Sequence, residues 1–158
     1  MSAILTQDLS RIISVAARCQ VCRLAFAVGG EPYLVPMSFG FEVADGRLAL
    51  YFHCGQTGRK RAMLNHCPKV CFEMDTDARV VFGSRDCKTN MAYQSVVGFG
   101  SAVLLHDPAE KRKALGLIMA QYGKDGANDF PDAAVERTTV FRVLAEQATA
   151  KISGEQGL

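Results

Sequence analysis

Two tight-turn signals near the start of the chain constrain its fold more than any other feature. Gly29-Gly30 and Asp45-Gly46 supply residues that readily adopt positive φ, as two-residue hairpin loops require. The segments beside these turns, residues 21–28, 33–43 and 47–53, are short, apolar and strand-like. The first half of the chain is therefore predicted to be a meander of antiparallel strands.

The clearest helix signal covers residues 107–122. Asp107 is a good N-cap, Pro108 suits the first helical position, and Gly123 ends the helix. Its apolar stripe is expected to consist of Leu115, Ile118, Met119 and Tyr122. Shorter helices are predicted over residues 5–18, capped by Thr6 or Asp8, and over residues 57–65, with Thr57 as the N-cap.

The remaining segments add further strands, and strands dominate the chain. They are expected at residues 69–74, 80–82, 91–105 (bent near Gly98 or Gly100) and 138–144, with residues 124–134 irregular. Short hairpin loops favour antiparallel pairing, and a closed or nearly closed barrel would remove the exposed edges of such a sheet. The predicted fold class is mainly β with flanking helices (α+β), an antiparallel barrel.

Composition narrows the class of protein. A chain of 158 residues suits one domain over residues 1–158, and a net charge of +2 gives no field that argues for nucleic acid. No signal peptide and no apolar run of membrane-spanning length is visible, so we expect a cytoplasmic protein without a membrane partner. Six cysteines in such a chain are expected to be free thiols.

The segment that carries chemistry runs from strand to turn to helix, over residues 51–60. Arg59 and Lys60 fall in the first turn of the predicted helix, where the helix dipole disfavours cations by about 0.3–1 kcal/mol. A bound anion reverses that sign, because free N–H groups and both side chains would then converge on it. His53 ends the incoming strand and can add a donor. The spacing alone leaves an alternative open, a solvated basic face over residues 59–61.

Four segments in this order resemble the pyridoxamine 5′-phosphate oxidase-like split-barrel flavoproteins, in the branch of the 5-nitroimidazole-resistance proteins. The resemblance covers roughly residues 5–151. The segments are Pro32–Gly40, Leu50–His53 with Gly58–Lys60, Asn65–Phe72 and Tyr93–Gly100. The resemblance implies an antiparallel split β-barrel that binds FMN at the interface of a homodimer.

The same resemblance assigns site residues. Arg59 and Lys60 match the pair that grips the FMN phosphate, and Phe52 and His53 would lie near ring and phosphate. Tyr93 and Ser95 lie on a strand that could reach the flavin from the same subunit or from the partner subunit. The residues expected along the isoalloxazine ring are Pro36, Met37, Ser38 and Phe39.

The implied activity is that of an FMN-dependent oxidoreductase acting on a small-molecule substrate such as a nitroaromatic. His53 would be catalytic if it faces the ring, and the flavin would carry the redox chemistry. Two alternatives stay open. One is a flavin carrier, store or sensor without turnover; the other is a haem-binding relative with His53, His66 or His106 as axial ligand.

The cysteines offer two competing sites. Cys19 and Cys22 have redox-pair spacing, but a strand rather than a helix follows the first of them. His66, Cys67 and Cys71 could contribute to a zinc site, but paired Cys-x-x-Cys knuckles are missing. Both patterns fit packed or incidental thiols better, so no metal site is predicted.

Overall fold

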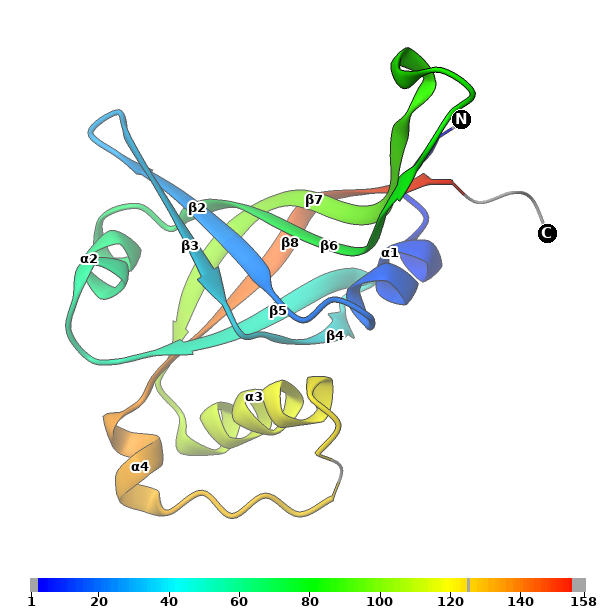
Figure 1. The fold of residues 1–158 in the computed structure, drawn as a ribbon. Helices are drawn as coiled ribbons and strands as arrows, with labels where there is room; N and C mark the ends of the chain where they lie inside the picture. The colour runs from blue at the N-terminus through cyan, green and yellow to red at the C-terminus, as the bar shows by residue number, and fades with distance from the viewer. Residues whose placement is uncertain (1–2, 125, 155–158) are drawn as a thin grey trace.

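The structure, a computed structural model, describes residues 3–124 and 126–154 (Figure 1). Its sheet runs in the order β3-β2-β6-β7-β8-β5-β4, and β1 pairs with β8 off this path. The elements are β1 (Ala3–Thr6), α1 (Leu9–Ala16), β2 (Cys22–Val28), β3 (Glu31–Met37), β4 (Gly40–Ala44), β5 (Arg47–Cys54), α2 (Arg59–His66), β6 (Lys69–Val81), the 3₁₀ turn η1 (Asp86–Lys88), β7 (Asn90–Leu105), α3 (Pro108–Gln121), α4 (Asp132–Arg137) and β8 (Thr139–Ser153).

Both predicted hairpins are confirmed. Gly29-Gly30 joins β2 to β3 with φ values of 61° and 81°, and Asp45-Gly46 joins β4 to β5 with φ values of 52° and 68°. The single strand predicted over residues 33–43 is wrong, because the chain breaks at Ser38-Phe39. The break lets the chain leave the edge beside β2 and pair with β5 instead, with the Phe39 side chain fully buried.

The second half contains three strands that are longer than the sequence predicts. The segments expected at 69–74 and 80–82 are parts of one strand, β6, which passes through an irregularity beside Asp77, a residue with φ 57°. The bend expected in β7 is confirmed, since its register with β8 shifts between Phe99 and Gly100. A Cβ on Gly100 would lie 2.4 Å from the main-chain oxygen of Leu144, so the strands approach closely there.

The helices confirm some boundaries and correct others. Asp8 caps α1 by accepting from Arg11 N at 3.1 Å, but residues 3–6 form β1 rather than the first turn of a helix. Gly58, with φ 105°, takes the N-cap position of α2 that Thr57 was expected to hold. The predicted cap of α3 is confirmed, because Asp107 accepts from Ala109 N. The expectation of irregular chain up to residue 134 is wrong at its end, where α4 begins.

The core is divided between the inside of the barrel and the space under α3. Five fully buried phenylalanines fill the barrel: Phe26, Phe39, Phe52, Phe72 and Phe141. A smaller cluster on the outer face of the sheet packs under α3, and its buried members are Ala49, Tyr51, Ala114 and Val140. In the described residues, no helix has the length and apolar character needed to cross a membrane.

The buried face of α3 differs from the predicted stripe. Its buried residues are Lys111, Ala114 and Ile118, whereas Tyr122 is 45% exposed. Burial of Ile118 is as predicted, but apolar periodicity missed the other two buried positions because a lysine and an alanine occupy them.

Candidate functional site

The start of α2 presents main-chain donors without a side-chain cap. Gly58 has no side-chain hydrogen bond to the helix, and nothing lies within 4 Å of the position that a Cβ would take there. The first N–H groups of a helix have no partner inside the helix, so those of α2 are available to a ligand. No acidic residue occupies the first turn. This end of α2 therefore carries positive potential from its dipole and from its side chains.

Arg59 turns back from α2 toward β3. Its guanidinium lies 4.5 Å from the ring centroid of Tyr33 and 3.9 Å from a carboxylate oxygen of Glu31, and its side chain is 53% exposed. The cation–π contact holds the guanidinium, while the distant and exposed carboxylate of Glu31 contributes little. Sequence reasoning did not include Tyr33 and Glu31, although their alternation on one strand places them on the same face.

Lys60 and His53 share an electrostatic environment. Partial burial of the imidazole lowers the pKa of His53, and the positive charge of Lys60 lowers it further. At neutral pH His53 is therefore neutral and able both to donate and to accept a hydrogen bond. The structure thus brings the predicted strand-end histidine within range of the charge on the predicted lysine.

The predicted ring-lining segment lies where β3 gives way to β4. Pro36 and Ser38 are exposed, whereas the side chains of Met37 and Phe39 are buried. The hydroxyl of Tyr122 accepts from Phe39 N at 3.2 Å and donates to Gln20 O at 2.7 Å, which fixes this segment against the end of α3.

Phe52 is fully buried and stacks on Phe141 with ring centroids 5.3 Å apart. In this chain Phe52, like Phe39, can act on a surface ligand only through its main chain or by supporting its neighbours.

Tyr93 and Ser95 lie far from α2. His53 pairs with Val140 near the start of β8, whereas Tyr93 pairs with Ser153 at its end. At about 3.3 Å per residue, this stretch of β8 measures roughly 40 Å along its path. The β6–β7 hairpin and α2 accordingly lie at opposite sides of the sheet (Figure 1). The predicted site residues therefore form two separate groups in one chain.

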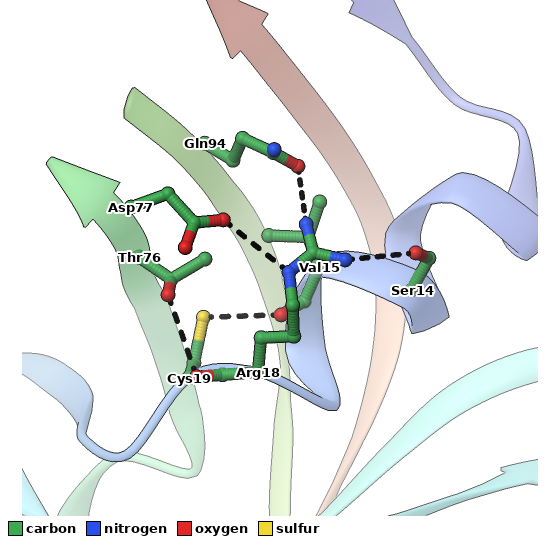
Figure 2. A network of polar contacts seen from close by, with 7 residues as sticks. All are labelled: Ser14, Val15, Arg18, Cys19, Thr76, Asp77 and Gln94. Atoms are coloured by element: carbon green, nitrogen blue, oxygen red, sulfur yellow. Dashed lines mark hydrogen bonds and ion pairs between the residues drawn. The ribbon is translucent and has the colours of Figure 1, made fainter. Parts of the chain in front are cut away.

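The group on β7 is held in place by Arg18, which follows α1. Its guanidinium donates to Ser14 Oγ at 3.1 Å, to Asp77 Oδ2 at 3.3 Å and to the side-chain oxygen of Gln94 (Figure 2). Gln94 stands between the two predicted residues of β7, so the network positions that part of the strand. On the other face, the Lys151 ammonium lies 5.0 Å from the ring centroid of Tyr93.

The sequence profile of the pyridoxamine 5′-phosphate oxidase family matches residues 8–152. The chain belongs to this family. The resemblance inferred from its four sequence segments is therefore confirmed, and so is the split-barrel fold class, although the sheet is an open path rather than a closed ring. Comparison with curated proteins gives no match.

Solved structures agree with this membership. A candidate 5-nitroimidazole antibiotic resistance protein from Bacteroides thetaiotaomicron is 32% identical, with a TM-score of 0.82 over 96% of this chain and 87% of that one. An FAD- and haem-binding protein from Mycobacterium smegmatis has the same TM-score at 16% identity, covering 96% of this chain and 74% of its own. An FAD-binding protein from Mesorhizobium loti reaches 0.68 at 23% identity, over 98% of this chain and all of its own. The last two share the fold alone.

All six cysteines of the chain are free. Cys19 and Cys22 are buried, and burial raises the pKa of the Cys19 thiol to about 12 and that of Cys22 further still. Cys19 Sγ donates to Val15 O at 3.3 Å (Figure 2), so it packs as part of the end of α1. Across residues 3–124 and 126–154, no three His, Cys, Asp or Glu side chains gather in a way that could hold a metal ion.

Proposed function

We propose that the chain binds FMN and passes electrons from a reduced donor to a small acceptor such as a nitroaromatic compound. The observation that carries this proposal is the start of α2. There the helix N-terminus has no side-chain cap, Arg59 and Lys60 are its first two residues, and the space beside Gly58 is open. A phosphate group fits these donors because it accepts from N–H groups and pairs with both cations. Because the chain belongs to the pyridoxamine 5′-phosphate oxidase family, we propose that this phosphate is part of a bound flavin.

The chain's own residues would then bind and orient the cofactor. The phosphate would rest on the N–H groups of α2, with Lys60 as its main cation and Arg59 available by swinging off Tyr33. His53, neutral at physiological pH, could hold or move a proton at its ring nitrogen beside the cofactor. When bound, the flavin supplies the electron transfer that the side chains cannot perform themselves.

The two groups of predicted residues support a homodimer. One FMN at α2 cannot also contact Tyr93 and Ser95 of the same chain, because β8 separates them along most of its length. A second copy could bring its own β7 to the first copy's flavin.

The outer face of the sheet offers a surface for this partner. Leu34, Ala25, Cys71 and Phe99 are aligned across four neighbouring strands, and Leu34 and Phe99 are 62% and 53% exposed. Such an apolar row on the outside of a sheet is typical of a protein–protein interface.

The test is flavin content. The purified protein should show the visible spectrum of oxidised flavin, and chromatography of the released flavin should identify FMN rather than FAD. The double variant Arg59→Ala/Lys60→Ala should lose most bound FMN and keep its circular dichroism spectrum. Lys113→Ala, which removes an exposed cation that pairs with Glu42, serves as the matched control.

Three outcomes contradict the proposal. Unchanged FMN occupancy in the double variant would show that the phosphate site is misassigned. A Soret band in place of the flavin spectrum would favour the haem-binding alternative. Light scattering that finds a monomer with FMN bound would refute the dimer. Oxidation of a reduced nicotinamide in the presence of a nitroaromatic distinguishes an oxidoreductase from a carrier or sensor.

A further inference from the structure

Two cavities meet at Lys111, and the smaller of them reaches α2 through Arg61. The larger, about 590 Å³, lies between the end of β7 and the helices α3 and α4. The smaller, about 240 Å³, lies between the loop that leads into α2 and the start of β8. Both are lined by Leu105, His106, Lys111 and Glu136. We refer to them together as the Lys111 cavities.

Lys111 is a charged side chain in a buried position. The residue is only 8% exposed, and its ammonium donates to the main-chain oxygen of Glu136 at 3.3 Å. Within the described part of the chain, no carboxylate lies within 4.0 Å of this ammonium. A buried ammonium with one neutral acceptor retains two unused donors and an uncompensated charge. Its position on both cavity walls makes these donors available to an anion.

The charges around Lys111 favour an anionic ligand. Arg61 and His106 line the smaller cavity with it, and Gln56 contributes an amide. Two acids line the larger cavity, and one of them, Asp132, is already paired with Arg112. The unpaired negative charge of Glu136 is therefore outnumbered by the positive charges of Arg61 and Lys111. Helix α3 also begins at this cavity, with Pro108 in its wall, but Asp107 caps that end and Glu110 lies in the first turn, so the positive charge here comes from the side chains.

The other walls are apolar. Leu105, Pro108 and Val135 line the larger cavity, and its volume falls in the range of small-molecule sites. We propose that the Lys111 cavities bind a nucleotide, with its phosphate on Lys111 and Arg61 and its base against Leu105 and Val135. This proposal does not depend on FMN at α2. Two ligands would present the same nucleotide chemistry to these cavities. One is a free nucleotide. The other is the ADP half of FAD, because Arg61 belongs to the same helix as Arg59 and Lys60, where the flavin phosphate is proposed to bind.

The experiment titrates the purified full-length protein with a fluorescent methylanthraniloyl derivative of ADP. Saturable binding is expected, and Lys111→Met should weaken it by about tenfold or more, since a charge-assisted hydrogen bond is lost. Lys113→Met, on the exposed side of the same helix, should bind as the wild type does. Arg59→Ala/Lys60→Ala should also keep ADP binding, which separates this site from the FMN phosphate site.

The arms of the experiment distinguish the two sources. If the source is a free nucleotide, protein loaded with FMN still binds the probe. If it is FAD, the released flavin is FAD, loaded protein excludes the probe, and Lys111→Met lowers FAD occupancy. Arg61→Gln, at a more exposed position, is the second variant should Lys111→Met fail to fold. The proposal is overturned if the wild type binds neither ADP nor FAD, or if folded Lys111→Met and Arg61→Gln both bind as the wild type does. The latter result would mean that Lys111 has a structural role only, through its hydrogen bond to the end of α4.

Discussion

Gly40 is the position where α3 approaches the sheet most closely, and Gly40→Ala tests that packing. A Cβ on Gly40 would lie 2.4 Å from both the main-chain carbon of Leu117 and the main-chain nitrogen of Ile118. Ordinary contact begins near 3.4 Å, so the helix would have to move by about 1 Å. Because the obstacles are main-chain atoms, no side chain can rotate to relieve the clash.

We expect Gly40→Ala to lower the free energy of unfolding by about 3 kcal/mol, the upper end of the usual cost of overpacking. The loss arises because α3 must separate from β4 and β5, which uncovers the cluster around Ala114 and Tyr51. The measurement is urea-induced unfolding followed by circular dichroism, with the slope compared between variants to detect a change in the surface that unfolding exposes.

Gly55→Ala is the matched control. Its Cβ would meet only Thr57 O, at 3.8 Å, which is an ordinary contact. We expect its stability to stay within about 0.5 kcal/mol of the wild type, as is usual for surface substitutions. If Gly40→Ala unfolds at the same urea concentration as this control, the close approach of α3 to β4 is wrong.

Two predictions concern titration. Lys60→Gln should raise the pKa of His53, measured by NMR, but leave it below its ordinary value of 6.5, because partial burial is the larger cause of the shift. Since the folded state resists protonation of His53, this residue makes folding less favourable as the pH falls below about 6.5. Burial and Glu42 together raise the pKa of Tyr51 to about 12, so one tyrosine should ionise late in an ultraviolet titration, and earlier in Glu42→Gln. Because the pKa of Tyr51 is higher in the folded state than in the unfolded state, the proton on Tyr51 stabilises the folded state. This stabilisation is complete below pH 10 and is lost as the pH rises to about 12. A tyrosine titration that Glu42→Gln leaves unchanged would refute the assignment.

The sequence was sufficient to predict those features that depend only on residues adjacent in the chain. The turns at Gly29-Gly30 and Asp45-Gly46 and the cap at Asp107 depend on residues next to one another, and all three are as predicted. Long-range pairing decided the rest. Residues 3–6 form a strand because β8 lies beside them, and β8 itself continues to Ser153 because β7 and β1 pair with it there.

The candidate site shows the same division. Sequence and resemblance placed His53 and Lys60 together at the end of β5 and the start of α2, and the structure agrees. The cavities at Lys111 had no sequence signal. Lysine in an amphipathic helix predicts a solvated face, whereas α3 packs against β4, β5 and α4 and Lys111 is buried.

An anion bound at α2 would be stabilised more by Lys60 than by Arg59. Arg59 already has compensation within the chain, from the ring of Tyr33 and more weakly from Glu31. Lys60 has no ion pair among the residues described, and its charge is felt at His53, where it lowers the pKa. An uncompensated cation at the positive end of a helix raises the energy of the protein alone. A phosphate that binds there removes this cost, so the unfavourable placement of Lys60 in the free chain is what would make the site favourable for the cofactor.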